Sequence, residues 1–484
     1  MAASIEVANQ AGNAAIVAAP YTWPTDFRDD IAAITVPTLI LHGEADGLPQ
    51  NLPQSFWESR PRLRHIRQAA HNRGRSADAV LGNILARVAA YTPHSFVLPA
   101  IVGDYASLNM IVGIVGPSGT GKSTAISLAQ RIVQPKHRTP LGRLDNAPLG
   151  SGEGTIEAYF EMVTEEGDDG KKRTEKQQTA FSALFVSDEI DQLAQQAGRS
   201  GATLMPTLRS AWSGGLLGQT NATGERNRRL NGHCYRFALV VGVQPEKAAG
   251  LLDDAAGGTP QRFAWFNATD ATIPEPDDRP DWPGEIAWSN PHVIDHLETT
   301  LLAGRRAGVI DVAPEIAKEI AWNDHQRQVG ERNTGIGDSH RDLIRVKIAA
   351  LLALLEERTN IDADDWELAE QVTDVSANIM ASMTARVREV VAEKNANHAA
   401  VASLIARKVA DDAEESALDA AVVQVAKTAA RLHSEGETLT RRKASRNLSK
   451  KAQAAPLDEA IAIAVQRGFI KPTATQGEWE VSVG

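Results

Sequence analysis

The stretch with the clearest chemistry is residues 111–124, IVGIVGPSGTGKST, where an apolar run leads into a glycine-rich turn. The turn matches G-x-x-x-x-G-K-[ST], the phosphate-binding P-loop motif, in which glycines allow successive backbone N–H groups to point at phosphate oxygens. In that motif Lys122 would reach the β- and γ-phosphates, and the Ser123 hydroxyl would bind Mg²⁺. The sequence therefore predicts a site for ATP and magnesium formed by Gly116, Pro117, Ser118, Gly119, Thr120, Gly121, Lys122, Ser123 and Thr124.

This motif needs a buried strand before it and a helix after it. Residues 108–115, LNMIVGIV, supply the apolar run of a buried strand, and residues 125–133 have helical spacing. A helix that begins near Lys122 would direct the positive end of its dipole at the same phosphates. These flanks disfavour the alternative, which is a chance glycine-rich turn.

An acidic pair follows a second apolar run at residues 183–189, ALFVSDE. Asp188 lies 188 − 122 = 66 residues after Lys122, a separation that fits another strand of the same sheet. At the end of that strand Asp188 would lie beside Ser123 and hold Mg²⁺ through its water shell. Glu189 would be the general base that orients and activates an attacking water.

The composition limits the class of protein. The 484-residue chain has no run of about 18 apolar residues, so we expect no transmembrane helix and no membrane partner. Its first residues lack a basic segment followed by an apolar one, so we expect no secretory signal. The single cysteine, Cys234, excludes an intramolecular disulfide and fits the cytoplasm as the expected location. Because the net charge is −11, any contact with DNA must come from a local basic patch.

The pattern along the chain predicts an α/β fold, with a P-loop NTPase parallel sheet core, a helical lid and a C-terminal winged helix. The winged helix is predicted from three helical patterns and a hairpin after residue 418. The expected regions are a poorly ordered 1–55, a helical subdomain 56–94, an ATPase core 95–285, a lid 286–382, and a connector with winged helix 383–484.

Three basic clusters are candidate contacts for DNA, and for each the alternative is an ordinary solvated surface. The first consists of arginines between residues 60 and 75. The second consists of cations at the tip of a charged hairpin. The third lies on the second helix of the predicted winged helix, whose third helix begins with Asp458 and Glu459 and would repel phosphates. A protein-docking role for that domain therefore stays open. The clusters are Arg60, Arg62, Arg64, Arg67, Arg73 and Arg75; Lys171, Lys172 and Arg173; and Arg441, Arg442, Lys443, Arg446, Lys450 and Lys451.

Over residues 56–382 the order of elements resembles a family of P-loop ATPases found in actinobacteria, their phages and integrated elements. The stretches that carry this resemblance are FWESRPRLRHIR, LPAIVGDYASLNMIVGIVGPSGTGKS, FVSDEID and GTPQRF. It implies an AAA+ or superfamily III-like ATPase, of helicase or primase type, that serves a mobile element.

Two more site residues follow from the resemblance to AAA+ proteins. These proteins have a polar residue, sensor 1, after a core strand, and Gln244 would be that residue after the apolar run 235–243. G-x-x-x-R-F at 258–263 resembles the arginine-finger element of minichromosome maintenance helicases. Arg262 would then reach the ATP of a neighbouring subunit, which implies a homo-oligomer such as a hexameric ring. The alternative is a structural arginine paired with Asp253 or Asp254.

Residues 337–357 and the segment after them are similar to the helical lid of the same helicases. The first lid helix there carries the residue called sensor 2. Arg341 or Arg345 would be that residue, and the spacing leaves both open.

Residues 24–49 resemble the strand and acid-bearing loop of α/β-hydrolases of the haloperoxidase and esterase branch. Asp46 would match the acid of the catalytic triad, but the chain has no G-x-S-x-G nucleophile elbow. We interpret the segment as a fragment or fused remnant.

The expected reaction is ATP hydrolysis, and the favoured function is that of a DNA helicase or replication protein of a phage or mobile element. One alternative is a regulatory or defence ATPase that acts on protein partners through the winged helix. A second alternative, a P-loop phosphotransferase, is disfavoured because a kinase has no need of a water-activating Glu189.

Overall fold

The computed structural model describes seven stretches of the chain, and all of them belong to the part from Pro49 to Gly484. The hydrolase-like segment 24–49, Lys171 and a helix expected at 290–305 lie outside the described residues. The described stretches are 50–136, 142–166, 172–190, 203–219, 228–289, 308–331 and 340–482.

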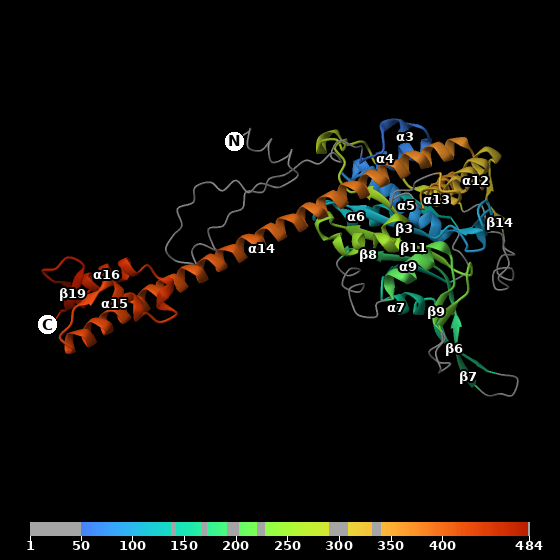
Figure 1. Ribbon diagram of the computed structural model, residues 1–484. Coiled ribbons are helices and arrows are strands. Elements are labelled where there is room, and N and C mark those ends of the chain that lie inside the picture. The colour runs from blue at the N-terminus through green and yellow to red at the C-terminus, as the bar shows by residue number, and fades with distance from the viewer. Residues whose placement is uncertain are drawn as a thin grey trace. The chain divides into compact units, whose positions relative to one another are not determined.

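A five-stranded, all-parallel sheet with the order β12-β3-β11-β8-β5 forms the centre of the fold (Figure 1). The apolar runs at 108–115, 183–187 and 235–243 form three of its strands, so these predictions are confirmed and the protein has a mixed α/β fold. The strands are β3 (Met110–Val115), β5 (Gly142–Pro148), β8 (Ala180–Ser187), β11 (Arg236–Val243) and β12 (Phe263–Asn267).

Strand β5 is a feature that the sequence analysis missed. Residues 142–154, GRLDNAPLGSGEG, indicate a loop because they are rich in turn residues, yet 142–148 pair with β8 at the edge of the sheet. The pairing shifts register at two places along β5. An edge strand needs only one partner and tolerates such irregularity, so weak strand formers suffice there.

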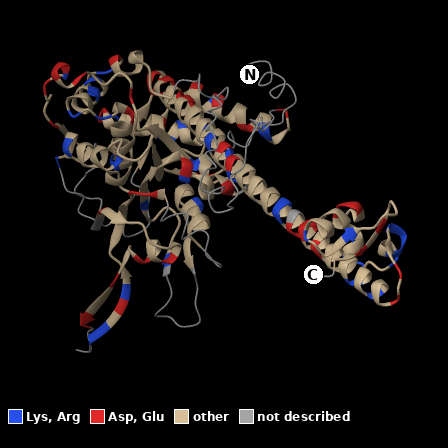
Figure 2. Cartoon of the chain, turned by 90° about the vertical axis from the view of Figure 1, so that its left-hand side faces the viewer, with Lys and Arg blue, Asp and Glu red and all other residues tan. Residues whose placement is uncertain are grey.

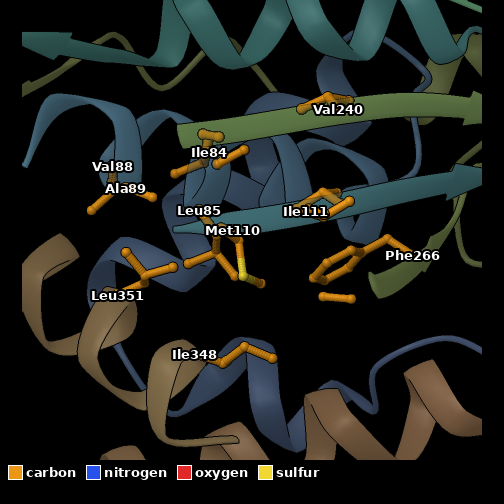
Figure 3. Close-up of a cluster of buried hydrophobic side chains, with 14 of the residues drawn as sticks. Ile84, Leu85, Val88, Ala89, Met110, Ile111, Val240, Phe266, Ile348 and Leu351 are labelled. Carbon is orange, nitrogen blue, oxygen red and sulfur yellow. The ribbon is translucent and has the colours of Figure 1, made fainter. Parts of the chain in front are cut away.

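Helices before β3 cover the sheet and share its core. They are α3 (Gln54–Glu58), α4 (Pro61–Asn72) and α5 (Ala77–Tyr91), and α5 is buried along its whole length. Figure 3 shows where α5 meets the sheet and the lid. Its residues Ile84, Leu85 and Val88 gather with Met110 and Ile111 of β3 and with Ile348 and Leu351, all members of one buried apolar cluster.

In the described part of the region predicted as a lid lie α12 (Pro314–Gln328), α13 (Arg341–Leu355) and the first part of α14 (Ala363–Ser434). The outer edge strand β12 is covered by α14, where the Trp265 backbone N–H donates to Ser376 Oγ at 2.8 Å. From α13 the ammonium of Lys347, which has no exposed surface, donates to the carbonyls of Asn109 at 2.8 Å and Trp212 at 2.7 Å.

Residues 363–434 form one continuous helix, whereas the sequence analysis divided them among a lid helix, a connector and the first helix of the C-terminal domain. The stretch contains neither glycine nor proline and is rich in alanine, so nothing in it ends a helix. Asp362 starts it with a capping box, in which its side chain accepts from the Asp365 N–H.

The end of α14 belongs to a second apolar cluster, which includes Val422, Val425, Leu432, Ile461 and Ile470. A three-stranded antiparallel sheet with the order β17-β19-β18 completes this C-terminal unit. The order of elements is the one expected from residue 418 onward. The elements are β17 (Leu439–Thr440), α15 (Arg441–Arg446), α16 (Leu457–Gln466), β18 (Ile470–Pro472) and β19 (Glu478–Val481).

The described residues include one hairpin that extends from the α/β body and another that packs against it. The described residues of the charged segment 165–176, predicted as a hairpin tip or loop, lie in the antiparallel pair β6 (Phe160–Glu166) and β7 (Lys172–Gln178), which carries charges of both signs (Figure 2). The second hairpin pairs β9 (Leu217–Gln219) with β10 (Arg228–Leu230).

Shorter elements complete the described part of the fold, together with the helices α6, α7 and α9 around the sheet. Their bounds are α6 (Lys122–Ile132), α7 (Gly152–Glu157), α9 (Leu204–Ser213), α10 (Ala249–Leu252), β1 (Phe96–Leu98), β2 (Ala106–Ser107), β4 (Val133–Pro135), β13 (Ile286–Trp288), β14 (Gly308–Val309), β15 (Asp311–Val312) and β16 (Asn360–Ile361). Among the described residues, no helix has the length and apolar character that crossing a membrane requires.

A buried carboxyl group fixes the start of the described chain on α5. Asp78 is 1% exposed, and its Oδ2 accepts from the Leu52 N–H at 2.9 Å and from Asn51 Nδ2 at 3.4 Å. Burial raises the pKa of Asp78 from 3.8 to about 7, with a further contribution from nearby Asp270.

We expect Asp78→Asn to stabilise the protein more at pH 8 than at pH 5. The pKa of Asp78 is higher in the folded than in the unfolded chain, so its contribution favours folding at low pH and is lost as the pH rises through about 7. The asparagine oxygen can still accept from Leu52. Urea unfolding at the two pH values should show a difference of roughly 1–3 kcal/mol, and an equal effect at both would contradict the assignment.

Candidate functional site

The predicted phosphate loop connects β3 to α6 at the carboxyl edge of the sheet. Gly119 and Gly121 have φ angles of 82° and 81°, in the left-handed region that favours glycine. Gly116 is buried, and a Cβ there would lie 2.9 Å from both Ala268 Cβ and Thr120 Oγ1. The backbone of this loop therefore requires glycine at the positions where the motif has it.

Lys122 begins α6 and folds back under the loop. Its Nζ donates to the carbonyls of Gly116 and Pro117, each at 2.7 Å. Burial lowers the pKa of Lys122, and the carboxylates of Glu189 and Glu246 oppose this change. The loop itself is open to a ligand, because its surface residues Pro117, Ser118, Gly119, Ser123 and Thr124 are exposed.

The acidic pair meets this lysine at Gly242, near the end of β11. A Cβ on Gly242 would lie 2.3 Å from the Asp188 carbonyl oxygen and 3.7 Å from Lys122 Cδ. The two motifs therefore approach the same point from either side of β11, which pairs with both β3 and β8. The side chains of Asp188 and Glu189 are exposed at this edge, and Gln244 follows β11 directly.

Arg75 is a neighbour of the loop that the sequence analysis did not single out. It comes from the turn between α4 and α5, and a Cβ on Gly121 would lie 2.8 Å from its Nε and 2.9 Å from its Cζ. The guanidinium thus packs directly on the loop and adds positive charge there. In the sequence Arg75 is one of a group of six arginines, and only the tertiary structure sets it apart.

The residues available to hold a metal at this edge are few. No group of three or more His, Cys, Asp or Glu suited to a metal occurs in the described stretches. The hydroxyl of Ser123 and the carboxylate of Asp188 are too few for an all-protein cage. Such a set fits Mg²⁺, which is typically held by one or two protein oxygens together with ligand phosphates.

Arg262 lies at the opposite edge of the sheet. It precedes Phe263, which pairs with Ile111 near the start of β3, so about 20 Å of strand separates it from Gly116. Of the two alternative partners, Asp253 and Asp254, the second binds Arg209 at 2.5 Å and also favours the charged form of Arg262 from a longer distance. Arg262 Nη1 donates to the Gly258 carbonyl at 2.6 Å.

The two lid arginines differ in their surroundings. Arg345 is 9% exposed, forms ion pairs of 3.1 Å with Glu319 and Glu370, and lies 3.7 Å from the Trp366 ring centroid. These contacts join α12, α13 and α14 and engage Arg345 with two carboxylates and an aromatic ring. Arg341 pairs with Asp374 at the start of α13 and lines a small pocket beside Gln261 and Phe263. The residues that line this pocket with Arg341 lie at the sheet edge where Arg262 is found, away from the edge that carries the phosphate loop.

Several cations of the predicted DNA-binding clusters are occupied by acidic side chains. Arg60 pairs with Asp365 at 2.8 Å and Arg62 with Glu357 at 2.9 Å, so this part of the first cluster joins α4 to the lid region. In the C-terminal unit Arg441 pairs with Asp458 at 2.6 Å, at the start of the third helix. On the hairpin, Lys172 and Arg173 are exposed.

No known protein-family model matches the chain.

We expect Gly242→Ala to destabilise the protein by about 1–3 kcal/mol, because the new methyl group collides with the backbone of Asp188. Gly150→Ala is the matched control, since its Cβ would meet no atom nearer than 3.6 Å. Both changes stiffen the unfolded chain equally, so the difference between their urea midpoints isolates the collision. Equal midpoints would mean that Asp188 does not lie where the structure puts it.

Proposed function

We propose that this protein is a magnesium-dependent ATPase of AAA+ type with a P-loop NTPase core. The observation that supports this most strongly is the meeting of Lys122, Asp188 and Glu189 at one sheet edge, beside a loop that requires glycine at the positions of the motif. In open parallel sheets this carboxyl edge is where ligands bind. The expected cytoplasmic location remains part of the same proposal.

In this proposal the loop N–H groups and Lys122 bind the β- and γ-phosphates, for which the ammonium exchanges its contacts with the Gly116 and Pro117 carbonyls. Ser123 and Asp188 would hold Mg²⁺, which, when bound, neutralises charge on the phosphate oxygens. Glu189 accepts a proton from water as the water oxygen attacks the γ-phosphorus and ADP leaves. Gln244 would orient that water, since it follows Val243, whose carbonyl accepts from the Gly116 N–H of the loop at 2.9 Å.

The proposal gives Arg262 a role between subunits. Because about 20 Å of strand separates it from the loop of its own chain, it would stabilise transition-state charge on an ATP bound by another copy. This requires a homo-oligomer, and a ring brings each Arg262 to the next site. Arg341, near the same edge, is the better candidate for sensor 2, because Arg345 is held by two glutamates.

A DNA helicase or replication protein of a phage or mobile element is the function we favour. Its support is the exposed hairpin with Lys172 and Arg173 and the C-terminal unit, whose helices and small sheet have the order of a winged helix. The alternative, a regulatory ATPase with protein partners, is supported by the Arg441–Asp458 pair, which weakens the basic character of the surface that would face DNA.

We expect Lys122→Ala and Glu189→Gln each to lower steady-state ATP hydrolysis by at least about 100-fold, since they remove phosphate binding and the base. Lys318→Ala is the matched control, because this exposed lysine lies on α12. Wild-type rates in the Lys122 variant would refute the ATPase. Stimulation by single-stranded DNA that fades with added salt favours the motor, and hydrolysis indifferent to DNA favours the protein partner.

We expect Arg262→Ala to be inactive alone and to regain activity when mixed with Lys122→Ala subunits. The mixture combines an intact loop from one copy with an intact arginine from the next, so activity returns only if Arg262 acts between subunits. A mixture as inactive as its components would contradict the role in trans.

A further inference from the structure

Trp212 lies at the centre of a cluster of cationic and aromatic groups near Arg262. It is 1% exposed and occupies the last turn of α9. The Arg262 guanidinium carbon lies 5.6 Å from its ring centroid, the Lys347 ammonium 3.7 Å, and the His340 ring 5.4 Å in an edge-on contact. Because His340 caps the start of α13 and Lys347 lies within that helix, the indole contacts both α13 and Arg262.

The guanidinium of Arg262 is held without a carboxylate. Nη1 donates to the Gly258 carbonyl, and Arg209 occupies Asp254. The positive φ of 80° at Gly258 and the 2.6 Å between its missing Cβ and Nη1 of Arg262 make glycine necessary there. Among the described residues, then, Arg262 contacts a carbonyl and an aromatic ring, and the carboxylate of Asp254, which binds Arg209 directly, acts on the Arg262 charge only from a longer distance.

The Trp212 side chain makes its contacts through the faces of its ring and not through the indole N–H. The buried indole N–H finds no acceptor among the described residues. Lys347 clamps the same residue by donating to its carbonyl at 2.7 Å. Burial, followed by Arg236 and Arg262, lowers the pKa of Lys347 well below its usual value, so keeping this lysine here costs stability.

We propose that Trp212, clamped by Lys347 of the lid helix, is a positioning residue that holds Arg262 ready for the nucleotide phosphates of a neighbouring copy. This inference rests on the proposed function and adds to it a direct connection between the lid and the arginine. A change in the position of α13 moves Lys347 and His340, and both bear on the ring against which Arg262 lies.

Mixed oligomers test the proposal. Trp212→Ala subunits should lose ATPase activity by about tenfold or more and should regain at least about fivefold when mixed with Lys122→Ala subunits, which supply an intact arginine. Mixing with Arg262→Ala subunits should restore nothing. Trp212→Phe keeps an aromatic face and loses only an N–H without a described partner, so it should keep most of the activity.

The matched control is Leu208→Ala, a truncation of a fully buried side chain on the same helix. We expect it to lower stability without being rescued by Lys122→Ala subunits. If Trp212→Ala fails to fold, Lys347→Met removes the clamp while keeping most of the side-chain volume, and it should show the same pattern of rescue.

Each outcome decides the question. If Arg262→Ala is rescued and both Trp212→Ala and Lys347→Met are not, Trp212 is only a core residue and the inference is overturned while the proposed function stands. If Lys122→Ala hydrolyses ATP at the wild-type rate, the proposed function itself fails. Rescue of the Trp212 or Lys347 variant by Lys122→Ala, but not by Arg262→Ala, supports the positioning role.

Discussion

The candidate site depends on the pairing of β11 with two neighbours at once. Hydrogen bonds to β3 and β8 fix the ends of all three strands at one edge, so that groups 66 residues apart in sequence, Lys122 and Asp188, meet across Gly242. A side chain at Gly242 would push the acid strand away from the loop strand. The absence of a side chain at Gly242 therefore sets the distance between the acid strand and Lys122.

Much of this arrangement could be predicted from the sequence, because its signals are local. The glycine spacing of the loop follows from backbone angles that only glycine adopts easily, and the apolar runs of β3, β8 and β11 follow from burial on both faces. Strand β5 was not predicted, because an edge strand needs no apolar run. The continuity of α14 was not predicted either, because no residue in it marks whether the helical pattern belongs to one helix or to several.

The rest of the site arises from tertiary contacts that leave no local pattern. Arg75 is one arginine among six in its stretch, and only the fold brings it onto Gly121. Arg341 and Arg345 are indistinguishable by spacing, whereas Glu319 and Glu370, from two other helices, occupy Arg345. Trp212 and Lys347 look like ordinary members of amphipathic helices. Only the fold places the Trp212 ring in contact with both Lys347 and Arg262.

The continuity of α14 has a mechanical consequence. From Val387, the last residue of this helix in the central apolar cluster, to its end at Ser434, the helix rises about 70 Å at 1.5 Å per residue. A rigid rod of that length converts a rotation of about five degrees at its base into a displacement of about 6 Å at its tip. A small change in the angle at which α14 leaves the central apolar cluster would therefore become a much larger displacement at the far end of the same helix.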